Sequence, residues 1–119
     1  MSQQSVLFTY PVKLSQDVPA KRFVNYSGAI AGGTVSSAPV FGVSEYDGLK
    51  NTVIPVHAQG SIIVEAGGAI SGGTTATSYG VYYDSVGRAV TAGTNTPVAF
   101  LAPGQAASGA GDFVEIIIF

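Results

Sequence analysis

The sequence predicts a small, single-domain, all-β protein, either a β-barrel or a β-sandwich, with glycine-rich turns and an extended N-terminal arm. Three observations favour this fold class. Helical periodicity is almost absent from the 119 residues. Apolar runs of strand length recur instead, and each run ends in turn residues. Glycine contributes 16 residues, about twice its usual share, which suits tight turns.

Short apolar segments separated by turn residues define the expected strands. Asp47 and Gly48 favour a tight turn after the third segment. Gln59 and Gly60 separate the fourth segment from the fifth, and residues 84–87 join the next two segments as a hairpin. In chain order, the expected strands are residues 6–14, 23–26, 39–43, 53–58, 61–66, 79–83, 88–91, 97–102 and 112–119.

Residues 1–20 are predicted to form an arm ahead of a β-barrel or β-sandwich domain at residues 21–119. Pro11 interrupts the run 6–14 and removes a donor from any β-ladder, which confines the segment to a sheet edge or an extended arm. An arm of this kind adds to a neighbouring sheet or subunit. Its candidate contact residues are the apolar side chains Leu7, Phe8, Tyr10, Val12 and Leu14. The alternative is an ordinary edge strand of the same domain.

The last expected strand is apolar on both faces. One face carries Phe113, Ile117 and Phe119, and the other carries Val114, Ile116 and Ile118. A small barrel or sandwich buries one face of each strand. The second face therefore requires a partner chain, or else a loop of the same chain that covers it.

An internal repeat joins two glycine-rich segments. Residues 28–34 return as residues 68–74 with one difference, Ala31 against Ser71. A phosphate-binding loop would carry a lysine and a following helix, which both copies lack. We expect two equivalent Gly-Gly turns, each after a strand, at positions that need a positive φ.

Composition excludes several classes of protein. The chain has no cysteine, so disulfide scaffolds, cysteine-based zinc sites and thiol nucleophiles are excluded. A net charge of −2 argues against a nucleic-acid partner. Polar residues, glycine and proline interrupt every uncharged stretch, so no membrane partner is expected. The first residues also lack the basic start of a signal peptide, so we expect synthesis and release in the cytoplasm.

No catalytic constellation is visible. A catalytic histidine needs an orienting carboxylate and a nucleophile, whereas His57 is the sole histidine and stands in no nucleophile motif. We expect His57 to be a polar side chain on the outer face of a strand. Glu45 and Asp47 share a turn but lack the further oxygen ligands of a calcium loop. The sequence thus predicts a protein that is not an enzyme, with no catalytic residue, no metal site and no cofactor.

Two other functions stay open. Tyr79, Tyr82 and Tyr83 lie between turns, and exposed tyrosines anchor sugars or protein partners. They favour, as the alternative function, a small β-type adhesion or carbohydrate-binding module. A hydrolase would rest on His57 with partners that the sequence does not reveal.

Five segments share their order and spacing with one known family. They are KRFV…GA at 21–29, VFGVS at 40–44, VIPV…GSIIVEAGGAI at 53–70, GVYYD…GRAV at 80–90 and AASGAGDFVE at 106–115. With these segments the chain resembles the capsid cement, or head decoration, proteins of tailed bacteriophages. Phe100, Leu101 and Ala102 depart from the family, which more often has a strand like Gly-Val-Ala there.

The resemblance implies a structural protein without catalysis. Proteins of this family bind the outer surface of the mature icosahedral head, bridge neighbouring major capsid protein subunits and stabilise the shell. They commonly form homotrimers. For this chain the implied partners are a phage major capsid protein and two further copies of itself, with no direct nucleic-acid contact. The implied location is the outer surface of the virion's capsid, after synthesis in the host cytoplasm.

Overall fold

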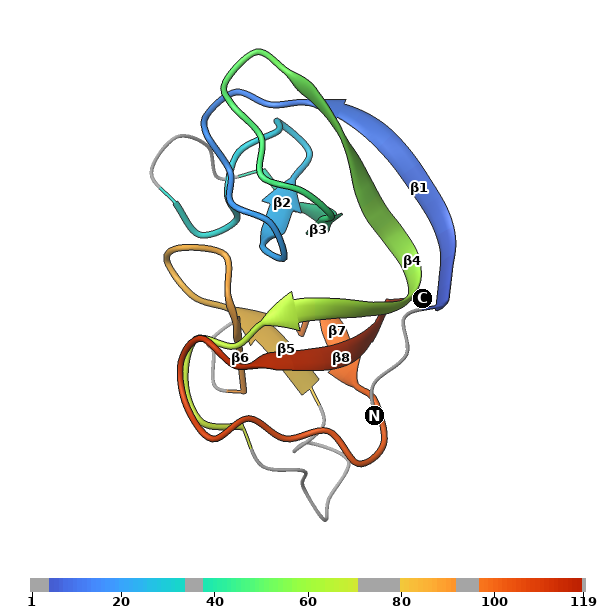
Figure 1. The fold of residues 1–119 in the computed structure, drawn as a ribbon, viewed down its shortest axis with the longest axis vertical. Coiled ribbons are helices and arrows are strands. Elements are labelled where there is room, and N and C mark those ends of the chain that lie inside the picture. Colours follow the sequence, from blue (N-terminus) through green and yellow to red (C-terminus); the bar gives the residue numbers. More distant parts are fainter. Residues whose placement is uncertain (1–4, 34–37, 71–79, 92–96, 119) are drawn as a thin grey trace.

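The structure, a computed structural model, describes residues 5–33, 38–70, 80–91 and 97–118. These residues form one eight-stranded antiparallel sheet that curls into a nearly closed, barrel-like shape (Figure 1). No helix occurs in the described ranges, so the all-β prediction is confirmed. The strands are β1 (Ser5–Lys13), β2 (Phe23–Asn25), β3 (Val40–Ser44), β4 (Val53–Glu65), β5 (Gly80–Tyr83), β6 (Ala89–Val90), β7 (Ala99–Leu101) and β8 (Phe113–Ile118).

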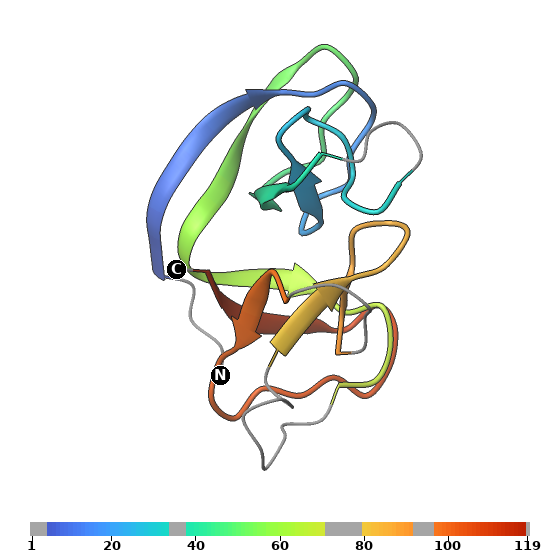
Figure 2. The ribbon, with the colours of Figure 1, turned by 180° about the vertical axis from the view of Figure 1, so that it is seen from behind.

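The sheet is arranged as two lobes that share one strand. Its order is β2-β3-β4-β8-β7-β5-β6, and β1 pairs with β4 outside this path. In Figures 1 and 2, β1, β2, β3 and the first half of β4 form an upper lobe. The second half of β4 and strands β5 to β8 form a lower lobe. The long strand β4 is therefore the common wall of the two lobes.

Strand β4 corrects the prediction of a break at Gln59 and Gly60. The chain continues as one strand of 13 residues, and it bends sharply between the lobes (Figure 1). Gly60 has a φ of 109°, which residues with a side chain rarely adopt. It pairs with Val6 of β1 and with Ile118 of β8. The glycine thus makes a bend inside a strand, where the sequence suggested a turn between two strands.

Each lobe has its own hydrophobic core. The upper core contains Leu14, Val18, Val24, Ile54 and Val56. The lower core is larger, and its bulky members are Phe23, Val43, Ile62, Val64, Ile70, Val81, Leu101, Val114 and Ile116. Strands β2 and β3 lie between the two cores, since Phe23 belongs to the lower core and Val24 to the upper one. This position explains why β2 is buried along its whole length.

Strand β1 lies at the edge of the chain's own sheet. It pairs with β4 along nearly its whole length, with register shifts on both sides of Phe8. Two residues that follow it, Leu14 and Val18, are in the upper core. In this structure β1 is an edge strand of the same domain, which is the alternative that the sequence left open. That it also reaches a neighbouring subunit stays a prediction.

The two copies of the repeat differ in backbone conformation. In the first copy, Gly28 and Gly32 have φ values of 81° and 80°, as predicted for glycine-dependent turns. In the second copy, Gly68 has no positive φ, and a Cβ there would meet open space. Residues 71–74 lie outside the described ranges. The equivalence of the two turns therefore does not extend to their first glycine.

The hairpin predicted around residues 84–87 is confirmed. Strands β5 and β6 pair through Tyr82 with Val90 and Tyr83 with Ala89. One carboxylate oxygen of Asp84 accepts hydrogen bonds from the backbone N–H groups of Val86 and Arg88. A short polar side chain that bonds its own turn in this way is the reason that aspartate favours tight turns.

Candidate functional site

The five predicted contact residues of β1 divide into exposed and buried groups. Leu7 is 73% exposed, and Phe8 and Tyr10 are about half exposed. Val12 is partly buried against the upper core. Leu14 is 1% exposed and belongs to that core. Leu7, Phe8 and Tyr10 are therefore available to a partner in this structure, whereas Leu14 holds the chain's own lobe together.

An open groove of about 500 Å³ runs beside β1, a size typical of ligand sites. We call it the aromatic groove. One wall is β1 from Phe8 to Lys13, and the other comes from the end of β2, the turn after it, and β3. The lining residues are Phe8, Tyr10, Pro11, Val12, Lys13, Asn25, Tyr26, Ser27 and Phe41.

The groove lies where no β-ladder joins β1 to β2; just beyond it, the N–H group of Ser15 donates a hydrogen bond to the carbonyl oxygen of Gly28. Among the described strands, β1 pairs with β4 alone and β2 pairs with β3 alone. The two edges approach without a ladder between them, and side chains fill the seam. Phe8, Tyr10 and Val12 face it together because alternate residues of a strand share one face.

Four aromatic rings form a continuous series along the groove. The ring centroids of Phe8 and Tyr10 are 6.3 Å apart, and those of Tyr10 and Phe41 are 5.9 Å apart. Tyr26 meets Phe41 edge to face, at 5.0 Å and 74°. Such edge-to-face pairs are favourable and leave the flat face of one ring free. Tyr26 is 67% exposed, so the ring series is open to a ligand.

Polar groups in the groove wall are few, and the main one is used internally. Asn25 is fully buried, and its side-chain oxygen accepts hydrogen bonds from the backbone N–H groups of Ser27 and Ala29. Lys13 is the one charged residue of the lining. It makes no ion pair within the described part of the chain. The groove is thus an apolar, ring-lined surface with one cation at its end.

His57 lies on the outer face of β4, as predicted, but neighbouring side chains bury it. Its Nδ1 is 3.0 Å from the hydroxyl oxygen of Thr9, and its Nε2 bonds a carboxylate oxygen of Glu45. Lys21 pairs with the same oxygen at 3.2 Å. The sequence showed no partner for this histidine because Thr9 comes from β1 and Glu45 from the turn after β3, and both meet it only in the fold.

The Thr9, His57 and Glu45 series has the order of a nucleophile, a base and an orienting acid. Neither Thr9 nor His57 lines the aromatic groove. What the series does in this structure is connect β1, β4 and the turn after β3 through side chains. No group of three or more potential metal ligands occurs in the ranges that the structure describes.

The two described tyrosines of the three that favoured a carbohydrate-binding module do not form an exposed platform. Tyr83 packs against the lower core, and Tyr82 is partly buried. Tyr79 lies outside the described residues. The exposed aromatic surface is instead the aromatic groove, on the other lobe.

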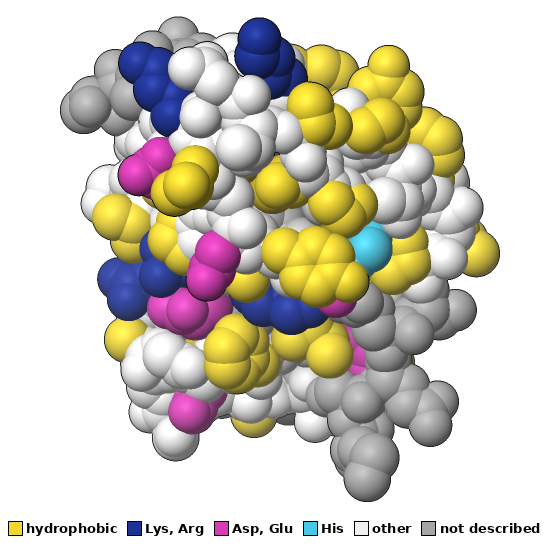
Figure 3. Space-filling model, turned by 45° about the horizontal axis from the view of Figure 1, so that its top comes forward, with side chains coloured by type: hydrophobic (Ala, Val, Ile, Leu, Met, Phe, Trp, Pro, Cys, Tyr) yellow, Lys and Arg dark blue, Asp and Glu magenta, His cyan; other side chains and the backbone are white. Residues whose placement is uncertain are grey.

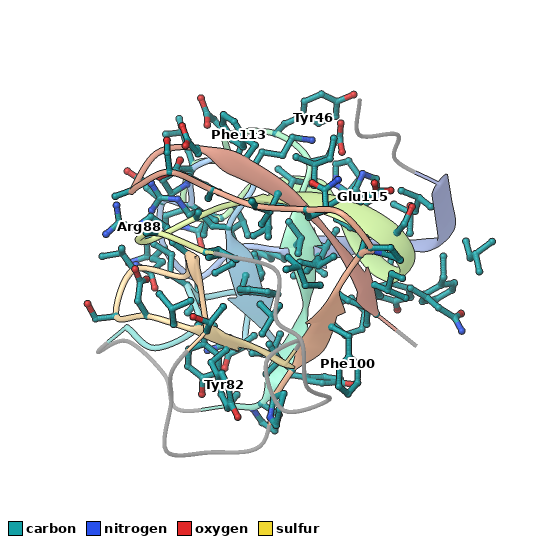
Figure 4. The ribbon with its side chains drawn as sticks, turned by 90° about the horizontal axis from the view of Figure 1, so that it is seen from below. Tyr46, Tyr82, Arg88, Phe100, Phe113 and Glu115 are labelled. Atoms are coloured by element: carbon teal, nitrogen blue, oxygen red, sulfur yellow. The ribbon has the colours of Figure 1, made fainter. Side chains whose placement is uncertain are left out.

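A second apolar surface covers the outer face of β4, β8 and β7. Phe113 and Phe100 are about half exposed, and the register places Ile63 opposite Glu115 and Phe100 opposite Ile117. Figure 4 labels Phe100, Phe113 and Glu115 on this side. Phe113 is therefore accessible on the second apolar face of the last strand, whereas Ile117 on the same face is partly buried.

Charged side chains are grouped between the lobes. Glu65 of β4 pairs with Arg22 at 3.2 Å and with Arg88 at 3.9 Å, and Arg88 also pairs with Asp84. In Figure 3 the charged side chains stand in separate groups, and hydrophobic side chains cover much of the surface between them. The ion pairs join the segment before β2, the end of β4 and the β5–β6 hairpin.

Tyr26 and Phe41 are the groove residues that sequence reasoning missed. Their segments were predicted as strands, but β1 and β2 do not pair, so no register relates Tyr26 to Tyr10. The available signal was two aromatic residues next to turn-forming glycine or proline segments, which is a weak one.

No helix of the described residues is long and apolar enough to span a bilayer.

Comparisons with known proteins find a likeness among solved structures. No protein-family model matches the sequence, and no curated protein matches it. The fold is similar to the crystal structure of the head fiber gp8.5 N base in bacteriophage phi29, with a TM-score of 0.65. The alignment covers 94% of this chain and 93% of that chain at 20% sequence identity. The likeness shows that the two chains share a fold over nearly their whole length.

Proposed function

We propose that this protein is a non-catalytic structural component of a phage head. It attaches to the outer surface of the capsid as a cement protein, bridges neighbouring major capsid protein subunits and stabilises the shell. The observation that carries the proposal is the fold shared with a phage head fiber base over nearly all of both chains. The sequence resemblance to phage cement proteins supports the same role from independent features of the chain.

Exposed apolar surfaces support a protein that works by contact. Monomeric proteins rarely leave large contiguous apolar patches open to water. Exposed apolar side chains of the described residues occur in the aromatic groove with Leu7 beside it and on the outer face of β7 and β8. Two separate surfaces allow a protomer to contact more than one neighbour, as bridging requires. We assign Leu7, Phe8 and Tyr10 to contacts with the capsid or a neighbouring subunit.

Cementing needs only modest contacts for each protomer. In a homotrimer, which we propose as the assembled form, the first contact makes the later contacts intramolecular. The avidity then rises by about 10² to 10⁴-fold where the geometry allows. The shell gains stability because a ligand that prefers the mature lattice shifts the equilibrium toward it.

Binding to heads tests the proposal. Purified protein is mixed with heads of the encoding phage that lack it, and the bound fraction is measured by sedimentation and located by cryo-electron microscopy. We expect density on the outer shell and a higher disassembly temperature. Heads that bind no protein, or density confined to the interior or the tail, would contradict the proposal.

A matched pair of variants tests the assigned contact surface. Leu7→Ser should weaken attachment, because it removes a side chain that is 73% exposed on β1. Leu49→Ser is the control, since Leu49 is 66% exposed but lies outside β1 and the groove. A loss of about tenfold is expected for a contact residue. Equal attachment of the two variants would remove Leu7 from the contact surface and leave the head-binding proposal intact.

A further inference from the structure

We propose that the aromatic groove binds an extended, proline-rich peptide segment of a partner protein, in the polyproline II conformation, with an acidic residue of that segment placed at Lys13. The proposal goes beyond head attachment, and it does not rest on that role. It follows from the ring geometry of the groove, the chemistry of the β1 edge and the single charge in the lining.

The rings supply the surface on which proline side chains pack. Tyr10 and Tyr26 both meet Phe41 at steep angles, 72° and 74°, so the rings form a corrugated surface with exposed faces. Polyproline II segments dock in aromatic-lined grooves of this kind, because their shape is formed before binding and costs little entropy. The hydroxyl groups of Tyr10 and Tyr26 are suited to donate hydrogen bonds to the peptide's carbonyl groups.

The β1 edge disfavours the main alternative, addition of a β-strand. Pro11 lies directly opposite Pro55 in the β1–β4 register. Opposite residues of an antiparallel ladder either exchange hydrogen bonds or direct their backbone groups away from each other. Two prolines cannot exchange such bonds, so the backbone nitrogen of Pro11, which carries no hydrogen, faces the open edge.

The edge of β1 is also blocked at Lys13, the next residue whose backbone groups face outward. The carbonyl oxygen of Lys13 lies so close to Gly28 that a Cβ there would be 2.2 Å from it. At the other end of the groove, the register shifts on both sides of Phe8. A strand added here would find an interrupted row of donors and acceptors. The groove therefore offers its side chains, and not a backbone ladder, to a ligand.

The charge and the hydrogen-bonding groups of the groove lining indicate which other chemical groups the ligand carries. Lys13 is the only charged lining residue and has no ion pair among the residues described, so it favours one acidic group. Sugars need several hydrogen-bonding groups for their hydroxyls. Here the side-chain oxygen of Asn25 is already used by two backbone donors. This set of groups fits a mainly apolar peptide better than a glycan.

The length of the wall sets the length of the segment. From Phe8 to Lys13 the strand spans about 16 Å, at about 3.3 Å per residue. Polyproline II rises about 3.1 Å per residue, so five or six peptide residues match it. The sharpest probe is therefore a capped peptide of five prolines followed by one aspartate.

Nuclear magnetic resonance with the full chain tests the proposal. Titration of ¹⁵N-labelled protein with the probe should shift the amide signals of β1 and of the residues around Tyr26 and Phe41. A peptide with glycine in place of every proline should bind at least about tenfold more weakly, because its chain must be ordered on binding.

Matched substitutions test whether the probe peptide binds in the aromatic groove. Tyr26→Ala should lower the probe's affinity by about tenfold. Tyr46→Ala should not, although Tyr46 is similarly exposed, at 60% against 67%, because it lies outside the groove. Lys13→Gln should remove the preference for the aspartate probe over the same peptide ending in lysine. Lys50→Gln, at an exposed lysine away from the groove, should keep that preference.

Three results would overturn the proposal. The first is no shift of groove signals at millimolar probe, and the second is equal binding of the proline and glycine peptides. The third is binding of a panel of oligosaccharides, lost in Tyr26→Ala, when the peptide does not bind; the groove would then be a sugar site. Each readout uses the isolated protein and a peptide, so failure here is distinct from failure to attach to heads.

Discussion

The hydroxyl oxygen of Thr9 lies 3.0 Å from Nδ1 of His57, its direct neighbour across the β1–β4 ladder. A carboxylate only accepts hydrogen bonds, so Nε2 of His57 carries the hydrogen that faces Glu45. In the neutral ring, Nδ1 then accepts the hydrogen bond that the Thr9 hydroxyl donates. This chain of side chains fastens the edge strand β1 to the rest of the upper lobe.

Thr9→Val should destabilise the protein by about 1 kcal/mol, because it preserves the side chain's shape but leaves a buried ring nitrogen without its partner. Urea unfolding at pH 8, followed by circular dichroism, measures the change. Thr91→Val, at an exposed threonine outside this network, is the control and should have little effect. Equal unfolding midpoints for the two variants would show that the hydrogen bond contributes nothing to stability.

Substitution of the two leucines of the N-terminal segment by alanine should change the free energy of unfolding by very different amounts. Leu14→Ala should cost about 3 kcal/mol, since Leu14 is fully buried in the upper core and its loss leaves a cavity. Leu7→Ala should change stability by less than about 0.5 kcal/mol, because Leu7 is exposed. Thermal unfolding of the two variants distinguishes them. A small effect of Leu14→Ala would mean that residues 1–20 are not part of the folded core.

Three glycines separate backbone strain from steric contact. Gly28→Ala should cost about 3 kcal/mol, since Gly28 has a positive φ and a Cβ there would meet the carbonyl oxygen of Lys13. Gly104→Ala should cost about 1 kcal/mol, because Gly104 has a similar φ but open space around it. Gly109→Ala, with neither feature, should be neutral or slightly stabilising.

Free energies of unfolding in urea measure this series. The order of the three costs is the decisive result, since each variant adds the same single methyl group. If Gly104→Ala proves as costly as Gly28→Ala, backbone strain alone accounts for both, and the contact between Gly28 and Lys13 contributes nothing.

Because of Asp112 in the turn before β8, the free energy of unfolding should depend on pH in the acidic range. Hydrogen bonds from the side chain and the backbone N–H of Ser108 hold the pKa of Asp112 below its usual value of 3.8. A carboxyl group with a lowered pKa in the folded state stabilises it above the unfolded pKa. That contribution is lost as the pH falls through the folded pKa. Asp112 therefore stabilises the turn at neutral pH, and this contribution begins to fall near pH 4 and is lost as the pH drops through the lower folded pKa.

A titration of the Asp112 carboxyl carbon by nuclear magnetic resonance measures this pKa directly. In Ser108→Ala the pKa should rise toward 3.8, because the largest stabilising hydrogen bond is lost. In Asp112→Asn the acid-dependent part of stability should be smaller than in the unchanged protein. An unaltered pKa in Ser108→Ala would contradict the assignment of the cause.

Local signals predicted the elements that depend on neighbours in the sequence. The β5–β6 hairpin follows from Asp84 and Gly87, whose turn chemistry is contained in a few residues. In β8 the alternation separated the face of Phe113 and Ile117 from the face of Val114 and Ile116, but it did not predict which face is buried; the structure buries Val114 and Ile116 and exposes Phe113. Gly60 misled the prediction because a glycine with positive φ serves a bend within a strand as readily as a turn between strands.

Contacts between residues far apart in the chain could not be predicted from the sequence. The partners of His57 come from positions 9 and 45, and the groove joins Tyr10 to Tyr26 across two edges that share no ladder. Leu14 was predicted as a contact residue together with Tyr10, because both are apolar side chains of the N-terminal segment that was expected to form an arm. The fold separates them, since the chain beyond Lys13 turns into the upper lobe, where Leu14 packs.

The placement of β2 between the cores has a consequence for how the molecule melts. Phe23 and Val24 are consecutive, yet each is fully buried in a different core. Opening either core displaces the short segment that fills the other. The lobes should therefore lose their amide-exchange protection together, in one cooperative transition, and a partner that rigidifies one lobe should protect the amides of the other.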